Sequence, residues 1–169
     1  MKINFIRAFE DNYIWTIEKE NEVILIDPGE ANPCFDYLKD KNLYAILLTH
    51  KHMDHVGGVK KLKEKFKDVR VYGPAETKNL NDITLKDEDE FEIFGYKFVV
   101  WKTNGHTEEH ISYLVNGNLF CGDTIFSSGC GRVFTGDYQS SFDSVQKIKQ
   151  LDKNILIYPA HEYTIDSIE

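Results

Sequence analysis

The sequence predicts an α+β fold in which two mixed β-sheets pack against each other and helices cover their outer faces. Strand-like and helix-like segments alternate along the chain, which is typical of layered α and β structures. Hairpin signals come early, with Asp11-Asn12 between two strand-like segments. The nearly unbroken apolar run Val23–Ile26 indicates a strand that is covered on both faces. We assign residues 1–169 to one domain, because a chain of this length usually forms one.

The predicted strands are β-rich segments bounded by turn residues. Tyr13, Trp15 and Ile17 alternate with their neighbours, as strand residues do. Asn116-Gly117 is a strong two-residue hairpin signal, and Gly95 marks a further hairpin. The predicted strands are residues 3–9, 12–18, 22–27, 45–48, 69–72, 91–94, 96–101, 112–115, 118–121 and 155–158.

The predicted helices follow apolar residues spaced three to four apart. Asn32-Pro33 opens the first helix, because proline is favoured in a first helical turn. A second helix is expected over Val56–Phe66 and a short one after Ala75. Ser140-Ser-Phe-Asp143 resembles a helix start with a capping acid. The buried stripe of that last helix is expected to be Phe142, Val145, Ile148 and Leu151.

Composition and charge exclude several classes of function. The net charge of −8 disfavours DNA or RNA as a partner, since binding them depends on Lys and Arg at the phosphates. The basic segment Lys60–Lys67 is therefore expected to be a solvated face. The three cysteines lack metal-site spacing and do not predict a disulfide framework. Without a signal peptide or an apolar run long enough to span a membrane, we expect a cytoplasmic monomer that contacts no membrane.

The segment Thr49–Gly58 carries the clearest chemical signal. It places four metal-binding side chain types within six residues, namely His50, His52, Asp54 and His55. His50 and His52 would share one side of an extended segment. Asp54 and His55 lie where the chain enters a helix, and they could bind a second ion. The segment therefore predicts two adjacent metal ions on a loop between a strand and a helix.

Three more candidate ligands stand where strand-like runs end, and such loops are where open α/β folds build sites. His106, Asp123 and His161 follow three of the predicted strands. Together with the first four they suit two ions about 3.5–4 Å apart with one shared carboxylate. Asp27, after the third strand, is either a turn residue or a partner that holds a ligand histidine in place. His110 is interpreted as a structural residue or a support rather than a ligand.

The same residues carry a resemblance to a known family. His50-Lys-His52-Met-Asp54-His55 matches the His-x-His-x-Asp-His signature of the metallo-β-lactamase superfamily, and the chain resembles its glyoxalase II branch, the hydroxyacylglutathione hydrolases. The motifs that carry this narrower resemblance are Asp11-Asn-Tyr-Ile-Trp15, Cys121-Gly-Asp-Thr124, Gly129-Cys-Gly-Arg132 and His161-Glu-Tyr-Thr164. The resemblance implies the αββα sandwich of that superfamily.

The resemblance also implies which residues bind metal, which are catalytic and which bind substrate. One metal would lie on His50, His52 and His106 and the other on Asp54, His55 and His161, with Asp123 bridging them. Asp54 and Asp123 would be catalytic by holding a metal-bridged hydroxide. The glutathione portion would bind at Arg132, Phe134 and Tyr163. The implied reaction cleaves the glutathione thioester S-D-lactoylglutathione to D-lactate and glutathione, and the two divalent ions would be Zn, or else Fe or Mn.

The chain departs from the family pattern at several points. Asn104 replaces the usual proline before His106, Glu109 replaces a small residue, and Thr135-Gly136 replaces Glu-Gly. Family members usually continue into a C-terminal helical domain, so the sequence is expected to be either a fragment or a protein that lacks that half of the pocket. Two alternatives therefore stay open. One is an iron persulfide dioxygenase of the same fold, and the other is a metal-binding domain with an incomplete substrate pocket.

Overall fold

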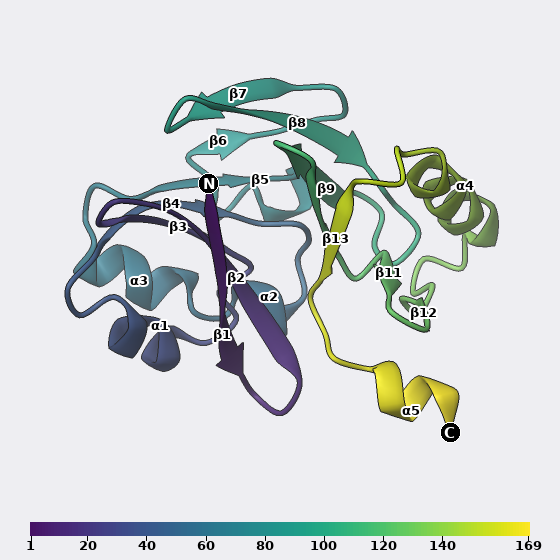
Figure 1. Ribbon diagram of the computed structural model, residues 1–169, viewed down its shortest axis with the longest axis horizontal. Helices are drawn as coiled ribbons and strands as arrows, with labels where there is room; N and C mark the ends of the chain where they lie inside the picture. The colour runs from purple at the N-terminus through teal and green to yellow at the C-terminus, as the bar shows by residue number, and fades with distance from the viewer.

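The first of two mixed β-sheets occupies the N-terminal half of the computed structural model, which describes residues 1–169 (Figure 1). Its strand order is β1-β2-β3-β4-β5-β6. The strands are β1 (Lys2–Ala8), β2 (Asn12–Lys19), β3 (Glu22–Ile26), β4 (Asn42–Leu47), β5 (Arg70–Gly73) and β6 (Ile83–Thr84). The first three strands pair antiparallel, whereas β3 to β6 pair parallel. Parallel pairing brings the carboxyl ends of these strands to one edge of the sheet.

The second sheet comes from the C-terminal half and has the order β13-β10-β9-β8-β7. Its strands are β7 (Glu90–Ile93), β8 (Tyr96–Lys102), β9 (Ile111–Val115), β10 (Asn118–Gly122) and β13 (Leu156–Pro159). β13 joins β10 in parallel, and the other pairs are antiparallel. A small ribbon of β11 (Ile125–Phe126) and β12 (Gly129–Cys130), which the sequence pattern does not predict, follows β10. The predicted hairpins at Gly95 and Asn116-Gly117 are both present.

Helices cover the two outer faces, so the predicted αββα layering is confirmed. The helical segments are α1 (Ala31–Tyr37), α2 (Met53–Val56), α3 (Val59–Lys65), the 3₁₀ turn η1 (Ala75–Thr77), α4 (Tyr138–Lys149) and α5 (Thr164–Ile168). α1 and α3 lie together on one side of the molecule, and α4 lies at the other (Figure 1). None of these helices combines the length and the apolar composition that a membrane crossing requires.

Three apolar clusters fill the spaces between the layers. Ile24 and Leu47 of the first sheet meet Phe98 and Tyr113 of the second in the central cluster. A second cluster packs α1 and α3 on the first sheet, and a smaller one packs Ile148 of α4 on the second. Complete burial of each such side chain stabilises the fold by about 1.5–3 kcal/mol. This packing holds the two sheets in a fixed position relative to each other.

The helix predicted over Val56–Phe66 is wrong in its extent. The structure has two helices there, because the chain breaks at Gly57-Gly58. A Cβ atom on Gly58 would lie 2.6 Å from the Pro28 carbonyl oxygen, so the close backbone contact there requires glycine. As a result, Asp54 and His55 lie on the short helix α2 instead of on the predicted loop.

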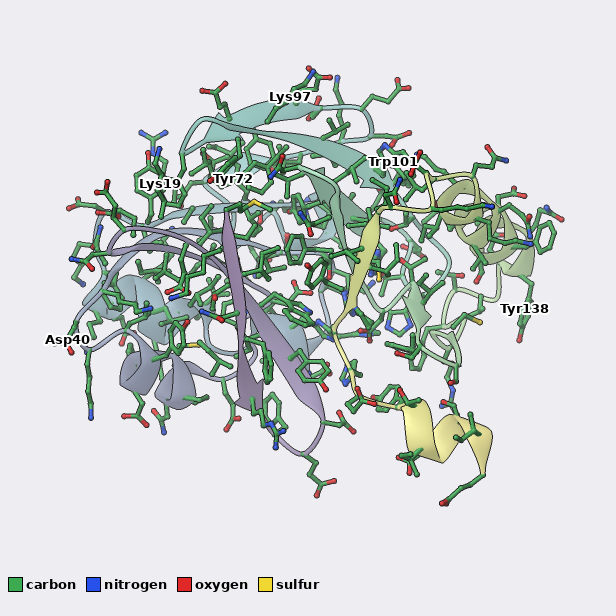
Figure 2. All side chains as sticks on the ribbon, in the orientation of Figure 1. Lys19, Asp40, Tyr72, Lys97, Trp101 and Tyr138 are labelled. Atoms are coloured by element: carbon green, nitrogen blue, oxygen red, sulfur yellow. The ribbon has the colours of Figure 1, made fainter.

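The start and the buried face of α4 also differ from the prediction. The helix begins at Tyr138, and the capping acid is Asp137, whose carboxylate accepts the Ser140 N–H at 2.9 Å. Phe142 is 58% exposed, and Ser144 occupies the buried stripe beside Ile148. Tyr138 points away from both sheets (Figure 2). Ser144 lets the helix approach closely, because its hydroxyl donates to the Asn104 carbonyl oxygen at 2.7 Å.

Thiol labelling of the folded protein is expected to modify Cys130 alone. Cys34 and Cys121 are buried, and burial raises the pKa of each thiol to about 12. The reactive thiolate is therefore scarce at both positions at pH 8. Cys130 is exposed on β12. Iodoacetamide treatment followed by mass spectrometry should show one adduct per folded chain and none in Cys130→Ser. An adduct on Cys34 or Cys121 before unfolding would contradict the burial of these two thiols.

Candidate functional site

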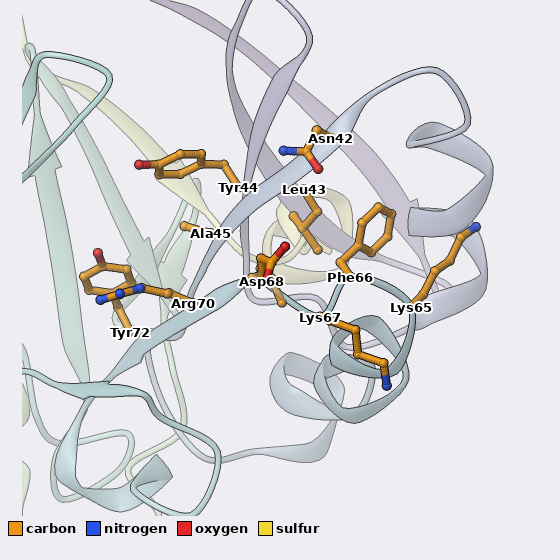
Figure 3. A pocket seen from close by; sticks show the side chains of 11 residues that line it. Asn42, Leu43, Tyr44, Ala45, Lys65, Phe66, Lys67, Asp68, Arg70 and Tyr72 are labelled. Carbon is orange, nitrogen blue, oxygen red and sulfur yellow. The ribbon is translucent and has the colours of Figure 1, made fainter.

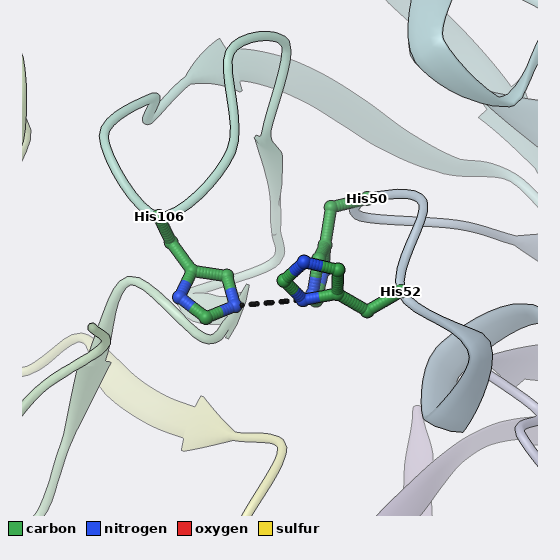
Figure 4. Close-up of side chains that lie close together, drawn as sticks. All are labelled: His50, His52 and His106. Atoms are coloured by element: carbon green, nitrogen blue, oxygen red, sulfur yellow. Dashed lines mark hydrogen bonds between the residues drawn. The ribbon is translucent and has the colours of Figure 1, made fainter. Parts of the chain in front are cut away.

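Three histidines form the first ligand group at one edge of the two sheets. His50 and His52 lie in the loop after β4, and His106 lies in the loop after β8. Ligand atoms of the three side chains all lie within 4.8 Å of one another (Figure 4). His52 Nδ1 and His106 Nε2 are 3.1 Å apart. Segments more than fifty residues apart in sequence thus converge because the strands before them end at the same edge.

A second ligand group lies beside the first and consists of Asp54, His55 and His161. Asp54 and His55 come from α2, and His161 follows β13. Asp54 Oδ2 lies 3.3 Å from His55 Nε2 and 3.2 Å from His161 Nε2, and the two imidazole nitrogens are 3.3 Å apart. The three atoms form a nearly equilateral triangle, which is one face of a tetrahedral coordination site.

Asp123, directly after β10, lies between the two ligand groups. Its Oδ1 is 3.4 Å from both His55 Nε2 and His161 Nε2. Its Oδ2 is 3.2 Å from His106 Nε2 and 3.9 Å from His50 Nε2. One carboxylate oxygen therefore faces each ligand group. The structure brings all seven predicted ligand side chains together in this arrangement.

Each of the four buried histidines in the two ligand groups has one ring nitrogen occupied by a partner outside the site. His106 Nδ1 donates to the Arg132 carbonyl oxygen, and His161 Nδ1 donates to Asp11 Oδ1, both at 2.8 Å. Such partners fix the ring orientation and leave Nε2 free to bind a cation. The sequence predicts Asp11 as a turn residue and places it in the motif Asp11–Trp15, but assigns it no contact with a ligand. Its role follows from the pairing of Asn12 with His161, which the sequence does not reveal.

Asp27 performs both of the roles that were left open for it. Its φ of 52° makes a turn after β3, and its carboxylate lies in a buried polar network. It accepts the Thr49 N–H and hydroxyl at 2.8 and 2.6 Å and lies 3.0 Å from His55 Nδ1. Thr49 Oγ1 is in turn 2.9 Å from His50 Nδ1. Asp27 is thus surrounded by donors, and it orients one histidine of each ligand group.

The charges of the site favour a cation. Burial lowers the pKa of His50 well below its ordinary value. Burial alone would raise the pKa of Asp123, but His55, His106 and His161 hold it well below its usual range. Burial opposes the charge on His161, yet Asp123 and Asp54 raise its pKa to about 10. Burial would also raise the pKa of Asp54, but His161 and His55 hold it below its usual range, so both carboxylates stay ionised across the neutral range.

Two buried atoms of the site have no hydrogen-bond partner in the protein, namely His50 Nε2 and Asp123 Oδ1. Such atoms are costly unless another group satisfies them. Ligands held ~2.0–2.1 Å from a tetrahedral ion lie roughly 3.3 Å from one another. The second ligand group and Asp123 Oδ1 match this spacing, with separations of 3.2 to 3.4 Å. The residues present fit a pair of divalent ions.

His110 lies behind the ligands and outside both groups. Its Nε2 accepts the Asp123 backbone N–H at 3.2 Å, and its ring stacks on His50 with centroids 4.8 Å apart. Gly122 permits this contact, because a Cβ there would lie 2.7 Å from His110 Nε2. Burial lowers the pKa of His110 to about 3, so the ring stays neutral and can accept. The supporting role expected for His110 agrees with these contacts.

The three residues predicted to bind substrate line a hollow of about 240 Å³ over the ligand groups. Phe134 is exposed and meets His52 and His106 edge to face, and the Arg132 guanidinium lies 5.7 Å from the Phe134 ring centre. Tyr163 stacks on His161 with centroids 4.7 Å apart. Burial, with Asp11 and Asp123 nearby, raises the pKa of Tyr163 to about 12, so its phenol is a donor. The hollow thus offers a cation, an apolar ring and a hydroxyl.

A larger hollow of about 700 Å³ lies at the opposite ends of β4 and β5. Arg70 and Lys67 line it but point to different sides of the sheet, and Asp68 lies between them (Figure 3). It contains no histidine and neither ligand group. Size alone does not make a site, since a binding pocket needs polar groups that converge. The smaller hollow over the ligand groups is therefore the candidate site.

Comparison with known proteins gives a consistent result. The model of the metallo-beta-lactamase superfamily matches residues 8–161. The hydroxyacylglutathione hydrolase of Actinobacillus pleuropneumoniae serotype 5b is 45% identical over 172 residues, which cover 100% of this chain and 73% of the relative. The hydroxyacylglutathione hydrolase of Cronobacter sakazakii is 47% identical, and the alignment covers 100% of this chain and 69% of the relative. The crystal structure of ETHE1 from Myxococcus xanthus superposes with a TM-score of 0.87 at 27% identity, covering 96% of this chain and 76% of that one.

Proposed function

This chain belongs to the hydroxyacylglutathione hydrolases of the metallo-β-lactamase superfamily, and on that premise we propose that it hydrolyses S-D-lactoylglutathione to D-lactate and glutathione. The observation that carries the proposal is the position of Asp123, with one carboxylate oxygen toward each ligand group. A carboxylate between two groups of histidines suits a shared ligand of two ions. A hydrolase of this kind needs no nucleophile from the protein.

Each ligand group would hold one divalent ion, with Zn the leading candidate and Fe or Mn as alternatives. Bound ions would supply Lewis acidity, which lowers the pKa of water and stabilises negative charge on a carbonyl oxygen. The protein's own part is to hold the ligand side chains rigid. Asp27, Asp11 and the Arg132 carbonyl group keep the Nδ1 protons of three histidines in place. Their Nε2 atoms are therefore the ring atoms that face the site and are available to a cation.

Substrate would lie in the hollow over the ligand groups. The Arg132 guanidinium is suited to a carboxylate of the glutathione portion, because its fork of donors matches a carboxylate in geometry and charge. Tyr163 offers a phenol donor next to His161. Water adds to the thioester carbon, the C–S bond breaks, and the products are a carboxylic acid and a thiol. A free thiol has a pKa of about 8.5, so thiolate is a tolerable leaving group near neutral pH.

The proposed reaction is tested by mixing metal-loaded protein with S-D-lactoylglutathione and following both loss of the thioester and release of thiol. We expect hydrolysis with two ions per chain. Oxygen uptake with glutathione persulfide, together with a single iron per chain, would instead support a persulfide dioxygenase. Two bound ions without hydrolysis of any glutathione thioester would indicate a metal-binding domain with an incomplete pocket. Either result would contradict the proposal.

Replacing Arg132 with methionine is expected to raise KM for the glutathione thioester about 10-fold or more, with a smaller change in kcat. A hydrogen bond to a charged group is worth about 1.5–3 kcal/mol, and binding of the remote portion does not change during the reaction. Steady-state kinetics measure the effect. Arg70→Met is the matched control, because Arg70 is exposed and lines the larger, distant hollow. Equal KM values for the two variants would contradict the assignment of Arg132.

A further inference from the structure

Glu76 is a partly buried carboxylate that belongs to neither ligand group and to no motif of the sequence. It lies on the 3₁₀ turn η1, after β5. Its Oε1 accepts the Thr107 hydroxyl at 2.6 Å and the Lys51 backbone N–H at 3.2 Å. Its Oε2 accepts the Glu109 backbone N–H at 3.0 Å. One side chain thus binds three donors on two loops.

Those two loops are the ones that carry the first ligand group. Lys51 lies between His50 and His52, and Thr107 follows His106 directly. At their base the loops are joined by the Ile111 N–H, which donates to the Thr49 carbonyl oxygen. Nearer their tips, the hydrogen bonds that connect them end on Glu76 or join His52 to His106 directly. The Arg132 carbonyl oxygen holds the His106 ring itself, whereas Glu76 ties the loop of His106 to the loop of His52.

We propose that Glu76 is a positioning residue that sets the spacing of the first ligand group and so the affinity of that group for a divalent cation. The inference rests on the metal-binding role given to this site in the proposed function. The second ligand group does not share this support, because His55 and His161 are held by Asp27 and Asp11. Loss of Glu76 should therefore weaken cation binding at the first ligand group and leave binding at the second group unchanged.

Cobalt(II) titration of the metal-free protein, followed by visible absorption and competition with a chelator, tests this selectivity. His52→Ala and His161→Ala provide reference spectra in which one ligand group or the other is broken. Glu76→Met keeps the volume but removes all three acceptor contacts. We expect it to weaken cobalt binding at the first ligand group about 10-fold or more, as is usual when the partner of a metal ligand is lost, and to leave the second unchanged.

Two further variants separate the hydrogen bonds from general effects. Glu76→Gln can keep Oε1 but presents an amide donor to the Glu109 N–H, so its effect should lie between wild type and Glu76→Met. Glu108→Gln, at an exposed glutamate in the same loop, should bind both ions as wild type does. Thermal unfolding of each metal-free variant shows whether the fold is intact.

Unchanged cobalt binding in Glu76→Met, equal weakening at both ligand groups, or a lower unfolding temperature with no change in affinity would each overturn the inference. The proposed function is judged separately, on wild-type protein. If wild-type protein takes up only one ion, the proposal of a two-ion hydrolase is contradicted. The comparison of Glu76→Met with wild type is still valid if the reference spectra place that ion in the first ligand group. If they place it in the second, both proposals fail.

Discussion

Replacing Asp123 with asparagine is expected to lower kcat/KM for thioester hydrolysis about a thousandfold, or ~4 kcal/mol of transition-state stabilisation. Asp123 directs Oδ1 toward His55 and His161 and Oδ2 toward His106. Asparagine has nearly the same volume, but it is neutral, and one of its two terminal groups is an amide donor that cannot bind a cation. Whichever way the amide turns, one ligand group faces N–H instead of oxygen.

Metal analysis and steady-state kinetics on the same sample measure this prediction. The ion content of Asp123→Asn should fall below two per chain, and added metal should not restore activity. Asp68→Asn is the control, because Asp68 is exposed at the distant hollow and a neutral side chain there should change neither quantity. Full ion content together with activity within about threefold of wild type would show that Asp123 is not shared between the two groups.

The ligand set could be predicted because each member is a histidine or aspartate in the first loop cluster or directly after a predicted strand. His50, His106, Asp123 and His161 each follow a strand, and the ends of those strands meet at the site. The spacing of the apolar residues and the turn residues predicted most of the strands. The arrangement in two layered sheets followed from the strands. A side chain that follows a buried strand is thus placed by the topology, with little freedom left for the loop to move it.

The residues that support the ligands could not be predicted in the same way. Asp11 and Glu76 lie on a turn and on a short 3₁₀ segment, and although Asp11 stands in a family-like motif, no periodic or spacing signal connects either residue to the ligands. They reach the site only through contacts between segments far apart in sequence, such as the bond from His161 to Asp11. The exposed Phe142 shows the same limit, because the choice between Phe142 and Ser144 as the buried residue depends on how closely α4 approaches the Asn104 carbonyl.

Gly131→Ala is expected to weaken metal binding by about 10- to 100-fold and to lower the free energy of unfolding by ~1–3 kcal/mol. A Cβ on Gly131 would lie 1.9 Å from the Asp123 carbonyl oxygen and 2.9 Å from His106 Nδ1. Neither atom is the end of a flexible side chain. The loop would therefore have to withdraw and take with it the neighbouring Arg132 carbonyl oxygen, which accepts the His106 Nδ1 proton at 2.8 Å.

Gly129→Ala is a control within the same loop, because a Cβ at Gly129 would have nothing within 4 Å. Both changes add one methyl group and both reduce the freedom of the unfolded chain, so the difference between them isolates the contact with Asp123 and His106. Chelator competition measures ion affinity, and thermal unfolding of metal-free protein measures the cost to the fold. Similar values for the two variants would mean that this loop does not support the ligands. A loss of affinity confined to Gly131→Ala would show that the main chain of the Gly129–Arg132 loop holds His106 and Asp123 in the geometry that a cation requires.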